Sequence, residues 1–241
     1  MEYERAVQTA PPGWRHFTMS DLDRLPAAAR DHELARIPHA ERELLTAGDR
    51  EVSERILRAL FWSLVYHLEP ERWDALALAE PIHPSVLAAL PTARSRVLEI
   101  GAGSGRLTVH LTERCESLIA IEPAAGLARL LRSRLPDICV VAAWAEALPL
   151  PDGWSGLTAA CGLLGPDATV LNELERVTEV GGEIVLISPE QPEWFEGHGW
   201  RRLSFDPLPA APHDDWIDRF FGPPDPPHEL VSRRITRSAA G

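Results

Sequence analysis

The pattern of hydrophobic and polar positions changes near residue 94 of this chain. Before it, apolar residues recur every three or four positions, which is typical of amphipathic helices. After it, short apolar runs alternate with helical patterns, which indicates parallel strands joined by right-handed crossovers. The pattern therefore predicts two regions, a helical one over residues 1–93 and an α/β one over residues 94–241.

The clearest helical signal lies between residues 49 and 68. Five apolar residues follow a strict four-residue spacing there: Val52, Ile56, Leu60, Leu64 and Leu68. We expect one helix that ends at Pro70, because proline cannot continue a helix. Its stripe must be buried, and the sheet region is the nearest predicted surface, so residues 1–93 would form a cap or lid over it. The back of the sheet and a second subunit stay open as alternatives.

Seven segments of the α/β region have the composition of strands. They lie near residues 97–100, 117–121, 138–142, 157–161, 183–188, 201–205 and 229–236. Helical spacing predicts helices between them, among them one that carries Leu107, Leu111 and Cys115, and one that is closed by Gly181 and Gly182. Five strands thus alternate with helices, and two strands end the chain.

The stretch VLEIGAGSGRLT, residues 97–108, leads from the first strand into a helix, and three alternate glycines interrupt it: Gly101, Gly103 and Gly105. Glycine takes positive φ at little cost and lets a ligand approach the backbone. The helix that follows offers unpaired N–H groups and the positive end of its dipole. These features indicate a nucleotide-type site at the end of a parallel strand, although the glycines could also serve the turn alone.

The glycine spacing separates this motif from two other nucleotide motifs. A dinucleotide-binding loop has its third glycine where this chain has Arg106, and no Gly-Lys-Ser/Thr follows, as a P-loop requires. The pattern acidic-x-Gly-x-Gly-x-Gly, from Glu99 to Gly105, resembles motif I of the class I S-adenosylmethionine-dependent methyltransferases, with a UbiE-like motif order (types 11 and 25). The resemblance implies a Rossmann-like, doubly wound and mostly parallel seven-stranded sheet with an antiparallel final strand, and S-adenosyl-L-methionine as the cofactor.

Two further segments extend the resemblance. Glu122 ends the second strand, where an acidic side chain can accept hydrogen bonds from both ribose hydroxyls. The segment AAWAEALPLPD, residues 142–152, is similar to the family's adenine-lining segment, with Trp144 in place of the usual aspartate, either to stack on adenine or to pack in the core. The resemblance assigns the cofactor to Glu99, Gly101, Ala102, Gly103, Gly105, Glu122, Pro123, Trp144, Ala145, Glu146 and Cys161.

The predicted function is methyl transfer to a small molecule, by a transferase that works mainly through positioning and desolvation, in some cases with a general base. Candidate bases are His83, His67 and Tyr66, each of which also fits a purely structural role at a helix start or on a helix face. The alternative is a non-methylating cyclase, isomerase, ligand-binding or regulatory protein on the same scaffold. Arg106 argues against an NAD-linked dehydrogenase.

The composition excludes some classes of binding partner. A net charge of -12 over 241 residues argues against a nucleic-acid or anionic-membrane surface, because phosphates need neutralising cations. The three cysteines lie in apolar contexts without metal-ligand spacing, so we expect free thiols in a reducing compartment and no metal. With neither a signal segment nor a run of transmembrane length, the sequence predicts a cytoplasmic protein. As partners we expect a small-molecule acceptor, and as oligomeric state a monomer or homodimer.

Overall fold

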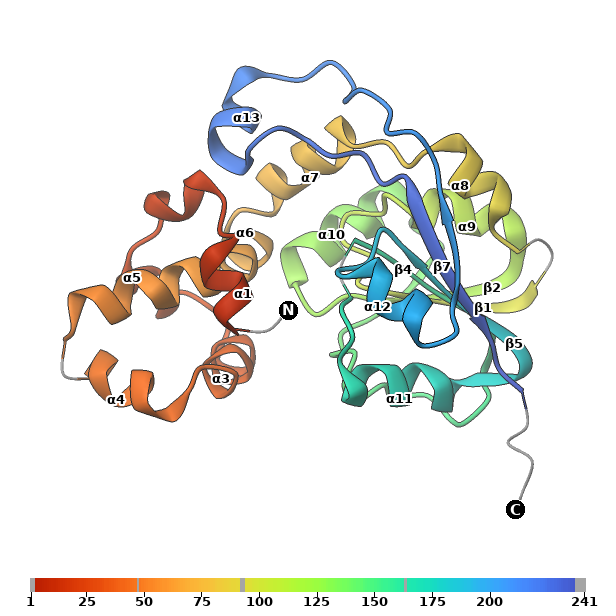
Figure 1. Ribbon diagram of the computed structural model, residues 1–241, viewed down its shortest axis with the longest axis horizontal. Coiled ribbons are helices and arrows are strands. Elements are labelled where there is room, and N and C mark those ends of the chain that lie inside the picture. Colours follow the sequence, from red (N-terminus) through yellow and green to blue (C-terminus); the bar gives the residue numbers. More distant parts are fainter. Residues whose placement is uncertain (1–2, 47, 92–93, 163, 237–241) are drawn as a thin grey trace. The chain divides into compact units, whose positions relative to one another are not determined.

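The computed structural model describes residues 3–46, 48–91, 94–162 and 164–236, and the chain divides into two compact units (Figure 1). The helical unit contains Met1–Ala79 and Pro212–Pro224, and the sheet unit contains Glu80–Ala211 and Asp225–Gly241. The division thus falls before the predicted boundary at residues 93 and 94, where residues 92–93 lie outside the described part. Residues 80–91 join the sheet unit because Ile82, Val86 and Leu90 pack into one of its apolar clusters.

The helical unit is built from short helices. They are α1 (Tyr3–Gln8), η1 (Pro12–His16), α2 (Met19–Leu22), α3 (Ala27–Ala35), α4 (His39–Thr46), α5 (Arg50–Ala59), α6 (Phe61–Leu68), α7 (Pro70–Ala79) and α13 (Asp215–Phe221). The single helix expected over residues 49–68 is therefore two helices, which meet at Leu60 with φ -95° and ψ 5°. Pro70 both ends the stripe and opens α7, because proline fits the first turn of a helix.

The apolar stripe is buried inside the helical unit itself. Ile56, Leu60 and Leu64 are at most 4% exposed. Their cluster includes Phe220 of α13, which is more than 150 residues away along the chain. A Cβ on Gly13 would lie 2.6 Å from the Phe220 carbonyl oxygen, so η1 and α13 approach each other as closely as a glycine permits. The stripe is thus covered in part by a segment of the same chain that is distant in the sequence.

The sheet unit contains all seven strands. They are β1 (Arg94–Ile100), β2 (Cys115–Ile121), β3 (Cys139–Val141), β4 (Ser155–Cys161), β5 (Thr178–Ile187), β6 (Arg201–Ser204) and β7 (Glu229–Arg234). Their order is β3-β2-β1-β4-β5-β7-β6. β7 runs antiparallel to β5 and β6, and the other neighbouring pairs are parallel. This confirms the predicted fold, including the antiparallel final strand.

Helices cover both faces of this sheet. They are α8 (Pro84–Ala89), α9 (Thr108–Leu111), η2 (Thr112–Arg114), α10 (Ala125–Arg134), α11 (Ala168–Val177) and α12 (Pro192–Gly197). One apolar cluster joins α8 and α9 to Val97 and Val185, and another joins α11 and α12 to the adjacent strand residues Leu98 and Ile184. Because neighbouring strand residues face opposite sides, the sheet is doubly wound, with α9 and α11 on opposite faces in Figure 1.

Two boundaries differ from those that the periodicity predicts. Leu107 and Leu111 are buried as expected, but the helical segment after the glycines ends at Arg114, and Cys115 already begins β2 in register with β1. Gly181 and Gly182 lie within β5, which begins directly after α11 and shifts its register with β4 between Ser155 and Leu157. In both places strand pairing extends the sheet into residues whose local pattern indicates a helix or its end.

Candidate functional site

The loop after β1 has the backbone that its glycines were expected to allow. Gly101, Gly103 and Gly105 have φ of 63°, 58° and 107°, in the left-handed region that L side chains rarely adopt. The Ala102 N–H donates to the Ile121 carbonyl at 3.0 Å and ties the loop to the end of β2. The strand order reverses at β1, between β2 and β4, and α/β sheets bind ligands at such switch points.

Glu122 follows β2 directly and holds this loop. Its side chain accepts hydrogen bonds from the Gly103 N–H at 2.7 Å and from the Ala124 N–H at 2.8 Å, one to each carboxylate oxygen. Burial raises its pKa to about 7, although both hydrogen bonds lower it. Pro123, between the two contacts, is half-buried. A carboxylate has acceptor positions left after two hydrogen bonds, so Glu122 can brace the loop and still accept from a ligand.

Glu99, on β1, is a second buried carboxyl beside the same loop. It is 2% exposed. Burial raises its pKa to about 8, and the charge of Glu122 raises it further. Within the described residues, Glu99 Oε2, Ser104 Oγ and Thr108 Oγ1 are buried without a hydrogen-bond partner. Unsatisfied buried polar atoms are costly and rare, and this group of three around one loop fits a site built for a polar ligand.

The predicted adenine segment lies on a framework supplied by α11. Ala145 packs against the core of the sheet unit, while Trp144 and Glu146 beside it are half-buried. Arg176 donates to Asp152 and to the carbonyl of residue 150, both at 2.8 Å, and to the carbonyl of residue 148 at 3.0 Å. The sequence analysis did not identify this arginine. A single charged residue on a helix face does not indicate that its side chain binds a loop about 25 residues earlier in the chain.

Arg106 has a role that the sequence analysis did not foresee. Its Nη1 donates to Glu80 Oε2 at 2.9 Å, and both side chains are nearly buried. Glu80 Oε1 also accepts from the Asp225 N–H at 3.0 Å. Burial raises the pKa of the half-buried Cys161 thiol at the end of β4, and Arg106 lowers this pKa by a smaller amount. The arginine thus links the glycine loop to the chain segments before α8 and β7 and to the end of β4.

The three candidate bases occupy separate settings. His83 belongs to the sheet unit and caps α8: its Nδ1 accepts from the Ser85 N–H at 3.0 Å, and its ring stacks on Phe205. Tyr66 and His67 belong to α6 of the helical unit. Tyr66 lies against the Trp73 ring at 5.0 Å between centroids, and burial lowers the pKa of His67.

Residues 97–182, from β1 into β5, match the family model described as a methyltransferase domain. Over this segment the chain is similar to the class I methyltransferase family. The match confirms the resemblance that carries the cofactor prediction, because members of this family use S-adenosylmethionine. The methyltransferase segment therefore includes the glycine loop, Glu122 and the loop held by Arg176.

Curated relatives match part of the chain. An uncharacterized methyltransferase of Mycobacterium tuberculosis is 34% identical over 115 residues, 47% of this chain and 46% of that protein. A demethylmenaquinone methyltransferase of Beutenbergia cavernae is 31% identical over 102 residues, 41% of this chain and 42% of that protein. The matches thus span less than half the length of these relatives.

A solved structure shares the fold. It is a chain of the complex between the Trm112 methyltransferase activator of Haloferax volcanii and a methyltransferase. The TM-score is 0.50 at 18% identity, over 71% of this chain and 99% of that chain. At this identity the likeness concerns the methyltransferase fold alone.

Three further findings bear on partners. All three cysteines are free. Among the described residues, no group of three or more His, Cys, Asp or Glu side chains is placed to hold a metal ion. In the same part of the chain, no helix combines the length and the hydropathy needed to cross a membrane.

Proposed function

We propose that this protein is an S-adenosylmethionine-dependent methyltransferase whose acceptor is a small molecule. The observation that carries the proposal is the glycine loop after β1, with three left-handed glycines, braced by Glu122 through the Gly103 N–H. The loop lies at the switch point of a sheet that has the order and the antiparallel strand of the family.

The residues around the loop suit the parts of this cofactor. The buried Glu99 carboxyl, with its unpartnered oxygen, fits the ammonium group of the amino-acid portion. Glu122 has acceptor capacity left for the two ribose hydroxyls. The Ala145 backbone and the neighbouring Trp144 and Glu146 are the proposed adenine contacts. When bound, S-adenosylmethionine supplies a methyl group that is activated by its sulfonium.

The contribution of the chain is binding, orientation and charge. Arg106, Glu80 and Arg176 fix the loops that carry these contacts, so the site needs little rearrangement when a ligand arrives. His83 is an unsuitable base in this arrangement: Nδ1 accepts a hydrogen bond, so Nε2 carries the proton of the neutral ring. A base at His67 or Tyr66, and a lid role for residues 1–93, stay predictions.

The acceptor class rests on charge. A net charge of -12 opposes the binding of polyanions, which favours a small acceptor over nucleic acid. The names of the relatives that match part of the chain do not decide between a small-molecule and a protein acceptor. One is a demethylmenaquinone methyltransferase and another is a protein-L-isoaspartate O-methyltransferase. Localisation in the cytoplasm and a monomeric or homodimeric state remain predictions.

Calorimetry tests the cofactor. We expect the wild-type protein to bind S-adenosylmethionine and its demethylated product, and Gly103→Val to bind them at least tenfold more weakly, because a branched side chain is strained at φ 58° beside the ligand. Gly197→Val is the matched control, since a Cβ there meets nothing within 4 Å. Binding of NAD without S-adenosylmethionine would contradict the assignment.

A labelled methyl group tests the reaction. The protein is incubated with S-adenosylmethionine carrying a tritiated methyl group and a cell extract, and the products are separated by size. We expect label in the low-mass fraction with wild type and none with Gly103→Val. Label confined to protein or nucleic acid would overturn the small-molecule acceptor, and tight cofactor binding with no transfer would favour the non-methylating alternative.

A further inference from the structure

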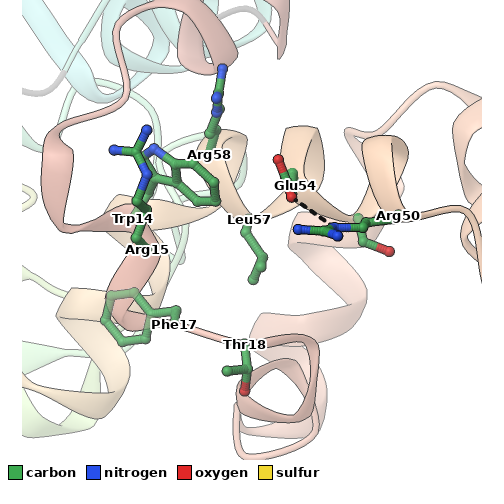
Figure 2. Close-up of a pocket in the computed structure, with 9 residues that line it drawn as sticks. Trp14, Arg15, Phe17, Thr18, Arg50, Glu54, Leu57 and Arg58 are labelled. Carbon is green, nitrogen blue, oxygen red and sulfur yellow. Dashed lines mark hydrogen bonds and ion pairs between the residues drawn. The ribbon is translucent and has the colours of Figure 1, made fainter.

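A groove of about 480 Å³ lies on the helical unit, between η1 and the first turns of α5 (Figure 2). All of its lining residues come from residues 14–18 and 50–58, so it is a feature of this unit alone and lies outside the glycine loop. Its volume is in the range of small-molecule sites. Nothing in the proposed methyl transfer uses these residues.

The groove has an excess of positive charge. Three arginines line it, Arg15, Arg50 and Arg58, against one carboxylate, Glu54. Arg50 Nε donates to Glu54 Oε1 at 3.2 Å, so this pair is compensated. Arg15 and Arg58 form no ion pair within the described ranges of the chain. Two uncompensated guanidinium groups therefore line one groove in a protein whose net charge is -12.

Both of these guanidinium groups lie over the same aromatic ring. The Cζ atoms of Arg15 and Arg58 are 4.8 Å and 4.7 Å from the centroid of Trp14. Figure 2 shows the two side chains beside Trp14 at one end, with Leu57 between them and the Arg50–Glu54 pair. Cation–π contacts of this kind hold a guanidinium in place while leaving its N–H groups available.

One of those N–H groups has no acceptor. Arg58 Nε is buried, and in the described part of the chain it has no hydrogen-bond partner. Leaving a buried donor of a charged group without an acceptor costs free energy, because the donor has lost its hydrogen bonds to water. Stacking on Trp14 attracts the cation but supplies no acceptor oxygen. An oxyanion in the groove would not reach this enclosed N–H, but it can pair with the other N–H groups of the same guanidinium, which match the geometry of phosphate and carboxylate oxygens.

We propose that this groove binds a small amphiphilic oxyanion. Its acidic group pairs with Arg58, attracted also by the charge of Arg15, and its apolar body lies along Leu57 and Phe17. Two positive charges favour a dianion, so we expect a phosphate monoester to bind more tightly than a carboxylate. The proposal is independent of the methyltransferase assignment, since it concerns a different unit of the chain.

Calorimetry on the 241-residue chain tests the ligand class with four probes, and the amphiphilic ones are kept below their critical micelle concentrations. Octyl phosphate carries both parts of the proposed ligand, octanoate replaces the phosphate, inorganic phosphate lacks the tail, and octanol lacks the charge. We expect octyl phosphate to bind most tightly, octanoate several-fold more weakly, and the other two at least tenfold more weakly. Equal affinity for octanol, or no binding of octyl phosphate, would overturn the proposal.

Three variants locate the binding site. Arg58→Gln should weaken octyl phosphate binding at least tenfold, and Arg15→Gln several-fold. Arg30→Gln is the matched control: it removes the same charge from α3 of the same unit, where Arg30 faces Asp23 at 3.6 Å, and should leave binding unchanged. Because Arg15 is exposed, its variant has little risk of misfolding. Equal binding by wild type and Arg15→Gln, or equal losses in all three variants, would contradict a site at this groove.

A vesicle experiment separates a soluble ligand from a lipid headgroup. The protein is sedimented with phosphatidylcholine vesicles that contain phosphatidic acid. Octyl phosphate binding without sedimentation supports a soluble ligand. Sedimentation that Arg58→Gln abolishes, together with octyl phosphate binding, assigns the same site to a lipid phosphate. Sedimentation without octyl phosphate binding would replace the proposal by a membrane surface.

Discussion

The two units place charge next to their candidate sites in opposite ways. The sheet unit buries two carboxyls, Glu99 and Glu122, at 2% and 5% exposure beside its glycine loop. The helical unit holds the guanidinium groups of Arg15 and Arg58 over Trp14 at the edge of an open groove. The first arrangement favours ligands that donate hydrogen bonds or carry positive charge, and the second favours anions.

The difference also decides whether the charge can change. Burial disfavours the ionised carboxylate, so the pKa values of Glu99 and Glu122 rise to about 8 and about 7, and their charge depends on pH and on what binds them. A guanidinium is charged throughout the accessible pH range and is weakly hydrated, so it tolerates contact with an aromatic ring. One site thus has an adjustable charge and the other a fixed one.

The largest expected effect concerns the separate cores of the units. Phe61 is fully buried and lies against Phe17 and Phe220 in the helical unit, so Phe61→Ala should lower the free energy of unfolding by about 3–5 kcal/mol. Phe195→Ala is the matched change in the sheet unit. Urea unfolding followed by tryptophan fluorescence, with and without S-adenosylmethionine, measures both.

Because the two cores are distinct clusters, we expect each substitution to shift a different transition. We expect the ligand to raise the midpoint of the sheet unit in wild type and equally in Phe61→Ala. One shared transition that both variants shift equally would show that the units unfold together, and the comparison between them would then not extend to stability.

The second prediction concerns the carboxyl of Glu122. Glu122→Gln should weaken S-adenosylmethionine binding by at least tenfold at pH 8, because charge-assisted hydrogen bonds to the ribose hydroxyls are worth about 1.5–3 kcal/mol each. Calorimetry compares it with Glu116→Gln, an exposed change of the same kind on the same strand. If Glu122→Gln and wild type bind alike, Glu122 serves only to brace the loop through Gly103 and Ala124.

The smallest expected effect is the pH dependence that distinguishes the two sites. Glu99 and Glu122 hold protons in the free protein below pH 7, and a cationic, hydrogen-bond-donating ligand favours their ionised forms. S-adenosylmethionine affinity should therefore rise between pH 6 and about pH 7.5, below the pKa of the ligand's own α-amino group, with protons released on binding. Octyl phosphate binding should level off near pH 7, once the phosphate is doubly ionised. Calorimetry in buffers of different ionisation enthalpy measures both trends.

The same pKa values fix the sign of an effect on stability. Between about pH 4.5 and pH 8 the carboxyls of Glu99 and Glu122 bind more protons in the native protein than in the unfolded chain, so their contribution to stability should fall as pH rises through this window. The lowered pKa values of His67 and His110 act in the opposite direction. Glu99→Gln should reduce that fall. The same pH dependence of the ligand-free melting temperature in wild type and Glu99→Gln, together with an S-adenosylmethionine affinity that is independent of pH, would show that these carboxyls are ionised in the free protein.

The sheet unit was largely predictable because its signals are local. Three glycines within five residues fix a turn that only such a backbone allows, and Glu122 follows its strand directly. Strand order and the antiparallel β7 came with the family resemblance carried by these residues. The contacts that hold the site, such as Arg106 with Glu80 and Arg176 with Asp152, join residues about 25 positions apart and leave no periodic pattern.

The helical unit was less predictable for the same physical reason. The stripe from Val52 to Leu64 showed that a face must be buried, but not which segment covers it. The answer includes Phe220, in a region that reads as a Pro-rich excursion between two strands. The groove depends on Arg15 and Arg58 meeting at Trp14, a contact between residues more than 40 positions apart. Sequence spacing does not reveal such a meeting.

The helical unit consists of two segments that are far apart along the chain, and this has a consequence for its folding during synthesis on the ribosome. Its first 79 residues emerge early, but the residues of α13 that complete its core are made only after about 135 further residues. At about 5–20 residues per second, translation leaves the apolar stripe without Phe220 and Phe221 for roughly 7–27 seconds. The core of the amino-terminal part of the nascent chain is therefore completed only when the carboxyl-terminal part has been made, and until then its apolar residues lack the cover that α13 supplies.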